Sequence, residues 1–219
     1  NSASACTDAD ERYLTFALGK GRLAKKTLQL FEKIGITCEE MKDKNSRKLI
    51  FVNEELKLKF FLAKGPDVPT YVEYGAADIG VVGKDTIVEE NRRVYEVLDL
   101  GFGKCRMCVA AKNEFRDNTS RPLRVATKFT NIAKNYYDSI GREIEIVKLN
   151  GSVELAPILG LSDVIVDIVE TGKTLVENGL SVKEEIVPIS ARLIVNKSSY
   201  FFKSDEINKI VSELGGEKE

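Results

Sequence analysis

The sequence has no histidine, so the side chain most often used for acid–base catalysis near neutral pH is absent. Zinc binding is also disfavoured, because only Cys105 and Cys108 among the four cysteines have the spacing of a metal or redox motif. Without a second such pair the chain offers too few zinc ligands. We therefore expect the cysteines to be structural or incidental, with these two in a strand, and the protein to be cytoplasmic.

Long hydrophobic runs are absent as well. Among the longest are Val164 to Val169 and Ile79 to Val82, whereas a membrane-spanning helix needs about 20 apolar residues. The sequence therefore predicts no transmembrane segment. Residues 1–12 are polar and acidic and lack the basic start and apolar run of a secretion signal. We expect them to be a disordered tail or an expression remnant.

There is no excess of charge of either sign. Lysine and arginine number 33 and aspartate and glutamate 34, for a net charge of -1. This balance disfavours a general electrostatic attraction to nucleic acid or to an anionic membrane. An anionic ligand must therefore be held by a local cluster. The 43% hydrophobic content is that of a globular protein with a sizeable core.

The first half of the chain alternates predicted strands and helices. A β-rich run at 13–18 leads through "GKGR" into apolar residues at helical spacing. Strand-like runs at 49–52 and 58–62 predict a hairpin, and a short helix and a buried strand at 78–82 follow. The polar stretch 113–121 interrupts this rhythm. The interruption predicts the start of a second lobe.

The second lobe repeats the pattern, with "RVAT", "IEIVKL" and "VIVDIV" as strands and "IAKNYYDSIG" and "NGSVELAPILGLSD" as helices. The unbroken apolar run of "VIVDIV" favours a parallel strand covered on both faces. We expect a mostly parallel sheet in each lobe, with ligands at the carboxyl ends of the strands and a cleft between the lobes. The predicted boundaries are 13–103 for lobe I, completed by 194–219, and 104–193 for lobe II.

The stretch "DIVETGKTLVENG" at 167–179 resembles a phosphate-binding turn but breaks the rule for a P-loop. A P-loop has a glycine five positions before Gly172, where this chain has Asp167. Backbone N–H groups, the hydroxyls of Thr171 and Thr174 and the start of a helix instead suit a monophosphate. Asp167 lies inside an apolar strand, where a carboxylate costs free energy unless it is exposed or has partners.

Two interpretations of this stretch remain open. In the first, Asp163 caps a turn, Asp167 faces solvent and Thr171 caps a helix. In the second, the acidic side chains bind the hydroxyls of a ribose whose 5-phosphate lies in the turn. The second explains why a carboxylate, and not a glycine, precedes the loop.

Other polar residues follow predicted strands. Lys20 and Arg22 stand between a strand end and a helix start, where they can bind an anion. Gly83 and Asp85 follow the strand at 78–82, and Arg47 opens the predicted hairpin. Solvated surface lysines and arginines, a solvated hairpin edge and a tight turn are the ordinary alternatives. The convergence of such loops in both lobes favours a binding function.

Four segments together resemble the ATP phosphoribosyltransferase family: "FALGKGRL", "DVPTYVEYGAADIGVVGKD", "RVATKFTNIAKNYY" and "NGSVELAPILGLSDVIVDIVETGKTL". The resemblance extends from about Tyr13 to about Tyr200. It implies two α/β lobes similar to a type II periplasmic binding protein. It also implies a reaction, in which N1 of ATP attacks C1 of phosphoribosyl pyrophosphate. The products are N1-(5-phosphoribosyl)-ATP and pyrophosphate, in the first step of histidine biosynthesis.

The resemblance also implies roles for particular residues. The loop would bind the 5-phosphate. Asp167, together with Asp163 or Glu154, would bind the ribose hydroxyls or a magnesium-bound water. Mg²⁺ would accompany the pyrophosphate, with no direct protein ligand assigned. The residues assigned to phosphoribosyl pyrophosphate are Glu154, Asp163, Asp167, Thr171, Gly172, Lys173 and Thr174. Those assigned to catalysis are Lys20, Arg22 and Arg47, and those assigned to ATP are Lys20, Arg22, Gly83 and Asp85.

The length indicates a particular form of the family. Long forms carry a further histidine-binding domain, whereas this chain ends at Glu219, so it resembles the short form. That form works with a regulatory subunit similar to histidyl-tRNA synthetase, and we expect a hetero-octamer. Two other functions compete with this assignment. They are solute binding without catalysis and phosphoribosyl transfer to a free base, and the first ordinarily requires an export signal.

Overall fold

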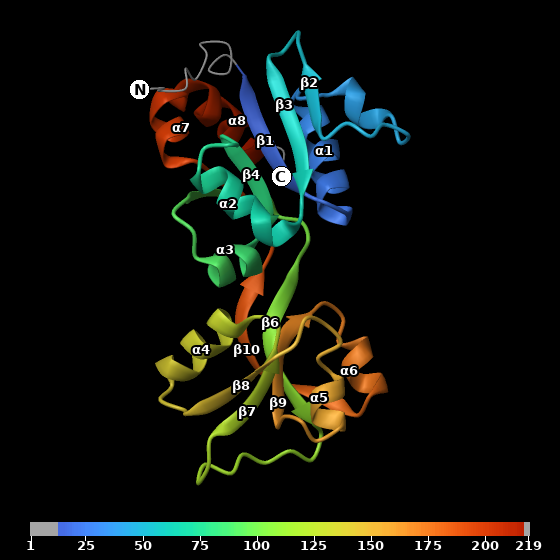
Figure 1. Cartoon of the computed structure of the whole chain (residues 1–219), viewed down its shortest axis with the longest axis vertical. Coiled ribbons are helices and arrows are strands. Elements are labelled where there is room, and N and C mark those ends of the chain that lie inside the picture. Colours follow the sequence, from blue (N-terminus) through green and yellow to red (C-terminus); the bar gives the residue numbers. More distant parts are fainter. Residues whose placement is uncertain (1–12, 217–219) are drawn as a thin grey trace, which may run out of the picture. The chain divides into compact units, whose positions relative to one another are not determined.

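The structure, a computed structural model, describes residues 13–216. The predicted tail at 1–12 lies outside the described residues. Contacts between residues divide the chain into two compact units (Figure 1). Unit 1 contains the residues up to Ile87, Asn91–Phe102 and those from Ala191 onward, and unit 2 contains Val88–Glu90 and Gly103–Ser190.

Unit 1 is built on a six-stranded sheet with the order β2-β3-β1-β4-β11-β5. Its strands are β1 (Leu14–Gly19), β2 (Ile50–Asn53), β3 (Leu58–Ala63), β4 (Ile79–Gly83), β5 (Tyr95–Asp99) and β11 (Ala191–Val195). Its helices are α1 (Arg22–Lys33), α2 (Val68–Glu73), α3 (Lys84–Glu90), α7 (Lys197–Phe202) and α8 (Ser204–Gly216), with 3-10 turns at Glu39–Lys42 and Gly65–Asp67. The last three residues of α3 are grouped with unit 2.

The core of unit 1 follows from the two-residue alternation of its strands. Phe16 and Leu18 of β1 share one apolar cluster with Phe31 of α1 and Ile207 of α8. Ala17 faces the other way, into a cluster with Val68 and Val72 of α2. Helices therefore cover both faces of the sheet, which leaves the strand ends and their loops as the places for polar side chains.

The C-terminal segment is fastened to this sheet through a buried carboxylate. Asp78, just before β4, accepts hydrogen bonds from the backbone N–H of Thr15 (2.8 Å) and the hydroxyl of Ser199 (2.6 Å). The ammonium group of Lys203 lies 3.2 Å from both of its oxygens. A charge with 7% exposure is stable only with such partners.

Unit 2 has a five-stranded sheet in the order β10-β6-β9-β7-β8. Its strands are β6 (Cys105–Lys112), β7 (Leu123–Thr127), β8 (Ile144–Lys148), β9 (Val164–Val169) and β10 (Leu180–Ile189). Its helices are α4 (Thr130–Ser139), α5 (Leu155–Ile158) and α6 (Lys173–Glu177). Helix α4 covers one face of the sheet, while α5 and α6 cover the other (Figure 1).

The expectation of mostly parallel sheets is wrong. In unit 1, β1 is parallel to β3 and β4, but β11 is antiparallel to both of its neighbours and β2 is antiparallel to β3. In unit 2, β7 is parallel to β8 and β9, whereas β6 is antiparallel to β9 and β10. The apolar run of β9 therefore has one parallel and one antiparallel neighbour. Strands β6 and β11 enter their sheets directly from the other unit, so no crossover helix forces them to be parallel.

Local predictions met a mixed outcome. The hairpin is present as β2 and β3, and "KCRMCVAA" lies within strand β6. In "NGSVELAPILGLSD" only Leu155–Ile158 is helical. Residues 191–193, which we expected in lobe II, pair with β4 in unit 1. Within residues 13–216, no helix combines the length and apolar character required to cross a bilayer.

Candidate active site

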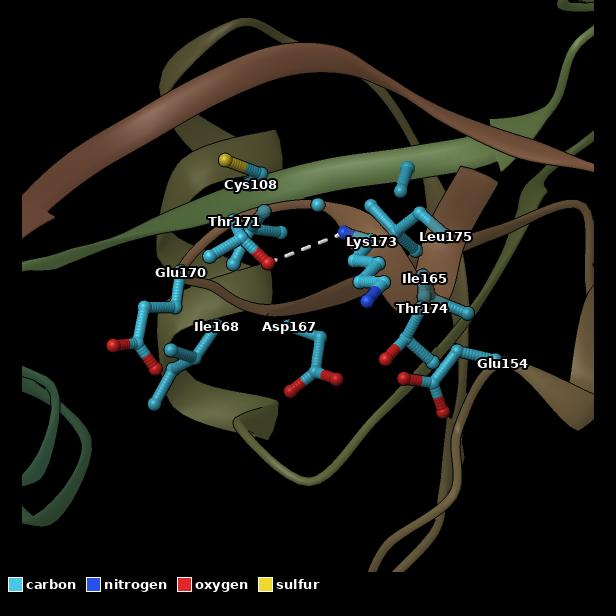
Figure 2. Close-up of a pocket in the computed structure, with 13 residues that line it drawn as sticks. Cys108, Glu154, Ile165, Asp167, Ile168, Glu170, Thr171, Lys173, Thr174 and Leu175 are labelled. Atoms are coloured by element: carbon cyan, nitrogen blue, oxygen red, sulfur yellow. Dashed lines mark hydrogen bonds between the residues drawn. The ribbon is translucent and has the colours of Figure 1, made fainter. Parts of the chain in front are cut away.

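Unit 2 contains a cavity of about 290 Å³ at the carboxyl end of β9. Its polar lining comes from the loop after β9, from Asp167 within that strand and from Glu154 immediately before α5, as Figure 2 shows. The residues that line it are Cys108, Ala110, Glu154, Ile165, Asp167, Ile168, Val169, Glu170, Thr171, Gly172, Lys173, Thr174 and Leu175. The cavity thus brings together every residue that we assigned to phosphoribosyl pyrophosphate except Asp163.

The loop between β9 and α6 has a defined backbone geometry. Gly172 adopts φ of 77°, a left-handed conformation that side chains with a Cβ rarely adopt. The Lys173 N–H donates a long hydrogen bond of 3.4 Å to the hydroxyl of Thr171 (dashed in Figure 2). Helix α6 begins at Lys173, and Leu175 is buried beneath it. The first turn therefore presents backbone N–H groups next to two threonine hydroxyls, which suits an anion with several acceptor oxygens.

The side chain of Asp167 lies on an apolar face of the unit 2 sheet. Strand alternation places Ile165 and Val169 on the same face as Asp167, in a cluster with Cys108 and Leu175. In the antiparallel pairing of β6 with β9, Cys108 lies directly opposite Asp167. Asp167 is therefore a carboxyl-bearing residue on an otherwise apolar face of the sheet, opposite a buried thiol.

This environment changes the protonation of Asp167. Burial raises the pKa of its carboxyl group to about 6, from an ordinary value of 3.8. The backbone N–H of Ile168 and the positive charge of Lys128 act in the opposite direction, and the negative charge of Glu154 raises the pKa further. A perturbed carboxyl group in a polar cavity indicates a functional site. Hydroxyl donors of a ligand would supply the hydrogen bonds that stabilise its ionised form.

Asp163 does not belong to this cavity. It precedes β9, at the opposite end of the strand from the loop. Its carboxylate forms ion pairs with Arg121 (3.0 Å) and Arg124 (3.1 Å) and accepts a hydrogen bond from the Arg124 backbone N–H (2.9 Å). Burial raises its pKa, but the hydrogen bonds from the two arginines outweigh burial and hold the pKa well below its usual range. We therefore correct the assignment of Asp163 from ligand binding to a structural ion-pair cluster.

The unit 1 residues that we assigned from sequence gather at one edge of its sheet. Strands β1 and β4 are parallel neighbours, so Lys20 and Arg22, which follow β1, lie at the same edge as Gly83 and Asp85 at the end of β4. Strand β2 is antiparallel to β3 and Ile50 pairs with Phe61, so Arg47, before β2, lies toward this edge too. Lys20, Arg22 and Arg47 are exposed, so three cationic side chains start from this region of unit 1.

Sequence reasoning missed Cys108 as a lining residue, because its spacing from Cys105 suggested only a strand. The register between β6 and β9 joins residues 59 positions apart, and no local pattern encodes it. Among residues 13–216, no group of three or more cysteine, aspartate or glutamate side chains is arranged to hold a metal ion.

The fold is that of an α/β protein of two units, each built on its own mixed sheet. Solved structures of this class include the substrate-binding protein of an amino acid ABC transporter, with a TM-score of 0.56, 14% identity and coverage of 94% of each chain. This likeness concerns the fold alone. The ATP phosphoribosyl transferase (HisG:HisZ) complex from Thermotoga maritima is more similar. Its matched chain gives a TM-score of 0.81 and 35% identity, with coverage of 93% of this chain and 97% of that one.

Sequence comparison is more specific. The family model described as ATP phosphoribosyltransferase matches residues 64–216. The ATP phosphoribosyltransferase of Lachnoclostridium phytofermentans is 64% identical over 206 residues, which is 93% of this chain and 96% of the relative. That of Lachnospira eligens is 61% identical over 206 residues, with coverage of 93% and 95%. This chain belongs to the ATP phosphoribosyltransferase family.

The environment of Asp167 predicts a pH-dependent stability. Because its pKa is raised on folding, the stability that its protonated form provides is complete below about pH 4 and is lost as the pH rises through about 6. Asp167→Asn imitates the protonated form. We expect the variant to be more stable than the wild type at pH 8, by at most about 3 kcal/mol, and equally stable at pH 4. Urea unfolding at both pH values measures the difference, and a variant that is less stable at pH 8 would contradict the prediction.

The ion pairs of Asp163 with Arg121 and Arg124 predict that replacing Asp163 by asparagine lowers stability, whereas the same change at Asp167 raises it. Asp163→Asn removes the partner of two guanidinium groups that are themselves partly exposed. We expect a loss of about 1–3 kcal/mol of unfolding free energy at pH 7, with the affinity for phosphoribosyl pyrophosphate unchanged. Urea unfolding and titration calorimetry test the two parts. A loss of affinity without a loss of stability would return Asp163 to the binding site.

Proposed function

We propose that this chain transfers the 5-phosphoribosyl group of phosphoribosyl pyrophosphate to N1 of ATP, with release of pyrophosphate, in the first step of histidine biosynthesis. The observation that carries the proposal is the unit 2 cavity. In it, the loop of Thr171 to Thr174, which turns at Gly172, adjoins the carboxyl groups of Asp167 and Glu154. Membership of the ATP phosphoribosyltransferase family supports it.

We assign the parts of the phosphoribosyl group to this cavity. The 5-phosphate would accept hydrogen bonds from the hydroxyls of Thr171 and Thr174 and from backbone N–H groups at the start of α6, with Lys173 adding positive charge. The ribose hydroxyls would donate to the carboxylates of Asp167 and Glu154. Both contacts together fix the orientation of the ring and hence the direction from which C1 can be attacked.

The chemistry requires little proton transfer. N1 of adenine has a free lone pair at neutral pH, so the attack on C1 needs no strong base and a chain without histidine can perform it. The bond from C1 to the pyrophosphate oxygen breaks as the bond to N1 forms, and negative charge grows on pyrophosphate. We propose that Lys20, Arg22 and Arg47 bind the phosphates of ATP and stabilise this charge. Gly83 and Asp85 complete the proposed ATP site.

Magnesium fits this scheme as a companion of the substrate. Its preferred ligands are oxygens, and it commonly remains bound to phosphates and water. We propose that Mg²⁺ is carried on the pyrophosphate oxygens, where it would neutralise charge on the leaving group, and we assign it no protein ligand.

The relative from Thermotoga maritima is described as a HisG:HisZ complex. We propose by analogy that this chain also assembles with a regulatory subunit, similar to histidyl-tRNA synthetase, in a hetero-octamer. We place the assembly in the cytoplasm, with histidine acting through the partner.

A direct test is mass spectrometry of the products formed from ATP, phosphoribosyl pyrophosphate and Mg²⁺, with a pyrophosphatase to draw the equilibrium forward. A phosphoribosyl-ATP adduct is expected. If both substrates bind and no adduct forms, the experiment is repeated with the regulatory subunit. Continued absence of the adduct would reject the proposal and leave solute binding as the better function.

Thr171 gives a test of the phosphate loop. Thr171→Leu replaces the hydroxyl that faces Lys173 with a bulky apolar group, so the affinity for phosphoribosyl pyrophosphate should fall at least about tenfold, the equivalent of about one charge-assisted hydrogen bond. Thr119→Leu, in the exposed segment between β6 and β7, is the matched control and should bind normally. Equal affinities by calorimetry would remove Thr171 from the site.

Arg22 gives a test of charge stabilisation on the leaving group. Arg22→Ala should lower turnover at saturating substrate by about 10²-fold, because one interaction with the growing charge is lost. Arg93→Ala changes another exposed arginine of unit 1 and should leave turnover unaffected. Steady-state kinetics compares them. Wild-type turnover in Arg22→Ala would show that Arg22 is an ordinary surface residue.

A further inference from the structure

Lys128 is a neighbour of Asp167, one of the two proposed ribose-binding carboxylates, but has no assigned role. It follows β7, the strand parallel to β9, and Thr127 of β7 is opposite Val166 of β9. The residues after this last pair are Lys128, just beyond the end of β7, and Asp167, within β9, so the two residues lie on adjacent segments of the chain. Ala126 and Ile165 precede them on the same face of the sheet.

The backbone at Lys128 is held rigidly. The hydroxyl of Thr127 is fully buried, donates to the carbonyl of Val166 (2.7 Å) and accepts from the N–H of Phe129 (2.8 Å). The first bond joins the end of β7 to β9, and the second fixes the turn that contains Lys128. The backbone of Lys128 is thus anchored, while the residue as a whole is exposed.

Several charged side chains near Asp167 affect its ionisation, and Lys128 is one of them. Asp167 is approached by Glu154 from the segment before α5, by Cys108 from β6, and by Glu170 and Lys173 from its own loop and α6. Glu154 opposes ionisation of Asp167, while the positive charge of Lys128 favours it. Within residues 13–216, Lys128 has no ion pair or side-chain hydrogen bond of its own, so its charge is not neutralised by another partner.

We propose that Lys128 is a positioning residue of the phosphoribosyl site, which keeps Asp167 and Glu154 together as an ionised pair of hydroxyl acceptors. Two carboxylates that converge on one ligand repel each other, and a cation at the adjacent strand end offsets this repulsion. Lys128 acts on the ribose through these carboxylates and makes no contact with the substrate. This role rests on the proposed function, whereas the electrostatic effect on Asp167 does not.

The first experiment needs no substrate. The carboxyl carbon of Asp167 is followed by NMR in protein labelled with ¹³C-aspartate, with Asp167→Asn to assign the signal. In Lys128→Met the titration midpoint should move upward by roughly half a unit to one unit, and Lys128→Arg should restore it. Lys148→Met is the matched control, because Lys148 is exposed at the end of β8, one strand further from β9. An unchanged midpoint in Lys128→Met would overturn the proposal.

The second experiment measures the affinity for phosphoribosyl pyrophosphate by calorimetry at pH 6.5 and pH 8.5. The ionisation state of phosphoribosyl pyrophosphate at each pH is the same for all variants. The difference in affinity between a variant and the wild type therefore reports a change in the protein. Lys128→Met should bind about two- to threefold more weakly at pH 6.5 and nearly normally at pH 8.5, where Asp167 is ionised in both proteins. An equal loss at both pH values would show direct contact with the substrate and would overturn the positioning role.

The two experiments separate this inference from the proposed function. If the wild type binds no phosphoribosyl pyrophosphate while the NMR midpoint still shifts, the proposed function fails together with the positioning role, and the electrostatic coupling stands. If the wild type binds the substrate and the midpoint does not shift, the function stands and the role of Lys128 fails.

Discussion

The candidate site depends on the burial of one carboxyl group. Asp167 occupies a position in β9 where the strand alternation calls for an apolar side chain, and its neighbours Ile165, Val169 and Cys108 pack in an apolar cluster. Burial disfavours the ionised form of Asp167 and raises the pKa of its carboxyl group to about 6. A fold that only needed a stable strand would place valine there. This unfavourable burial supports the proposed binding role of Asp167, in which a ligand with hydroxyl donors would stabilise the ionised form.

The rest of the cavity is arranged around this group. The loop after β9 turns at Gly172 so that α6 starts beside it, and the segment before α5 brings Glu154 to the same space. One side of the cavity thus offers hydroxyl and amide donors that suit an anion, while the other offers carboxyl groups that can accept hydrogen bonds. A sugar phosphate has both kinds of group, joined by a short and rigid ring, and it is this combination that distinguishes the cavity from a simple phosphate site.

Two acidic residues of the same short segment have opposite environments. Asp163 and Asp167 are four residues apart in sequence, yet Asp163 is neutralised by Arg121 and Arg124 at the start of β9, and Asp167 lies unpaired by arginine near its end. The first carboxylate stabilises the fold of unit 2 and the second is available to a ligand. The residue type alone did not distinguish them, because arginines 39 and 42 positions away decide the outcome.

The sequence by itself determined the elements and the chemical character of the loop. Local apolar periodicity predicted the β2–β3 hairpin, strand β9 and helix α4, and the residues Thr171 to Thr174 with Asp167 indicated a phosphate and a sugar. Only the tertiary structure decided the strand directions, the place of Cys108 opposite Asp167, the removal of Asp163 from the site and the position of Lys128 near Asp167. Periodicity is a property of neighbouring residues, whereas strand register and ion-pair choice are set by contacts between distant segments, which local patterns do not encode.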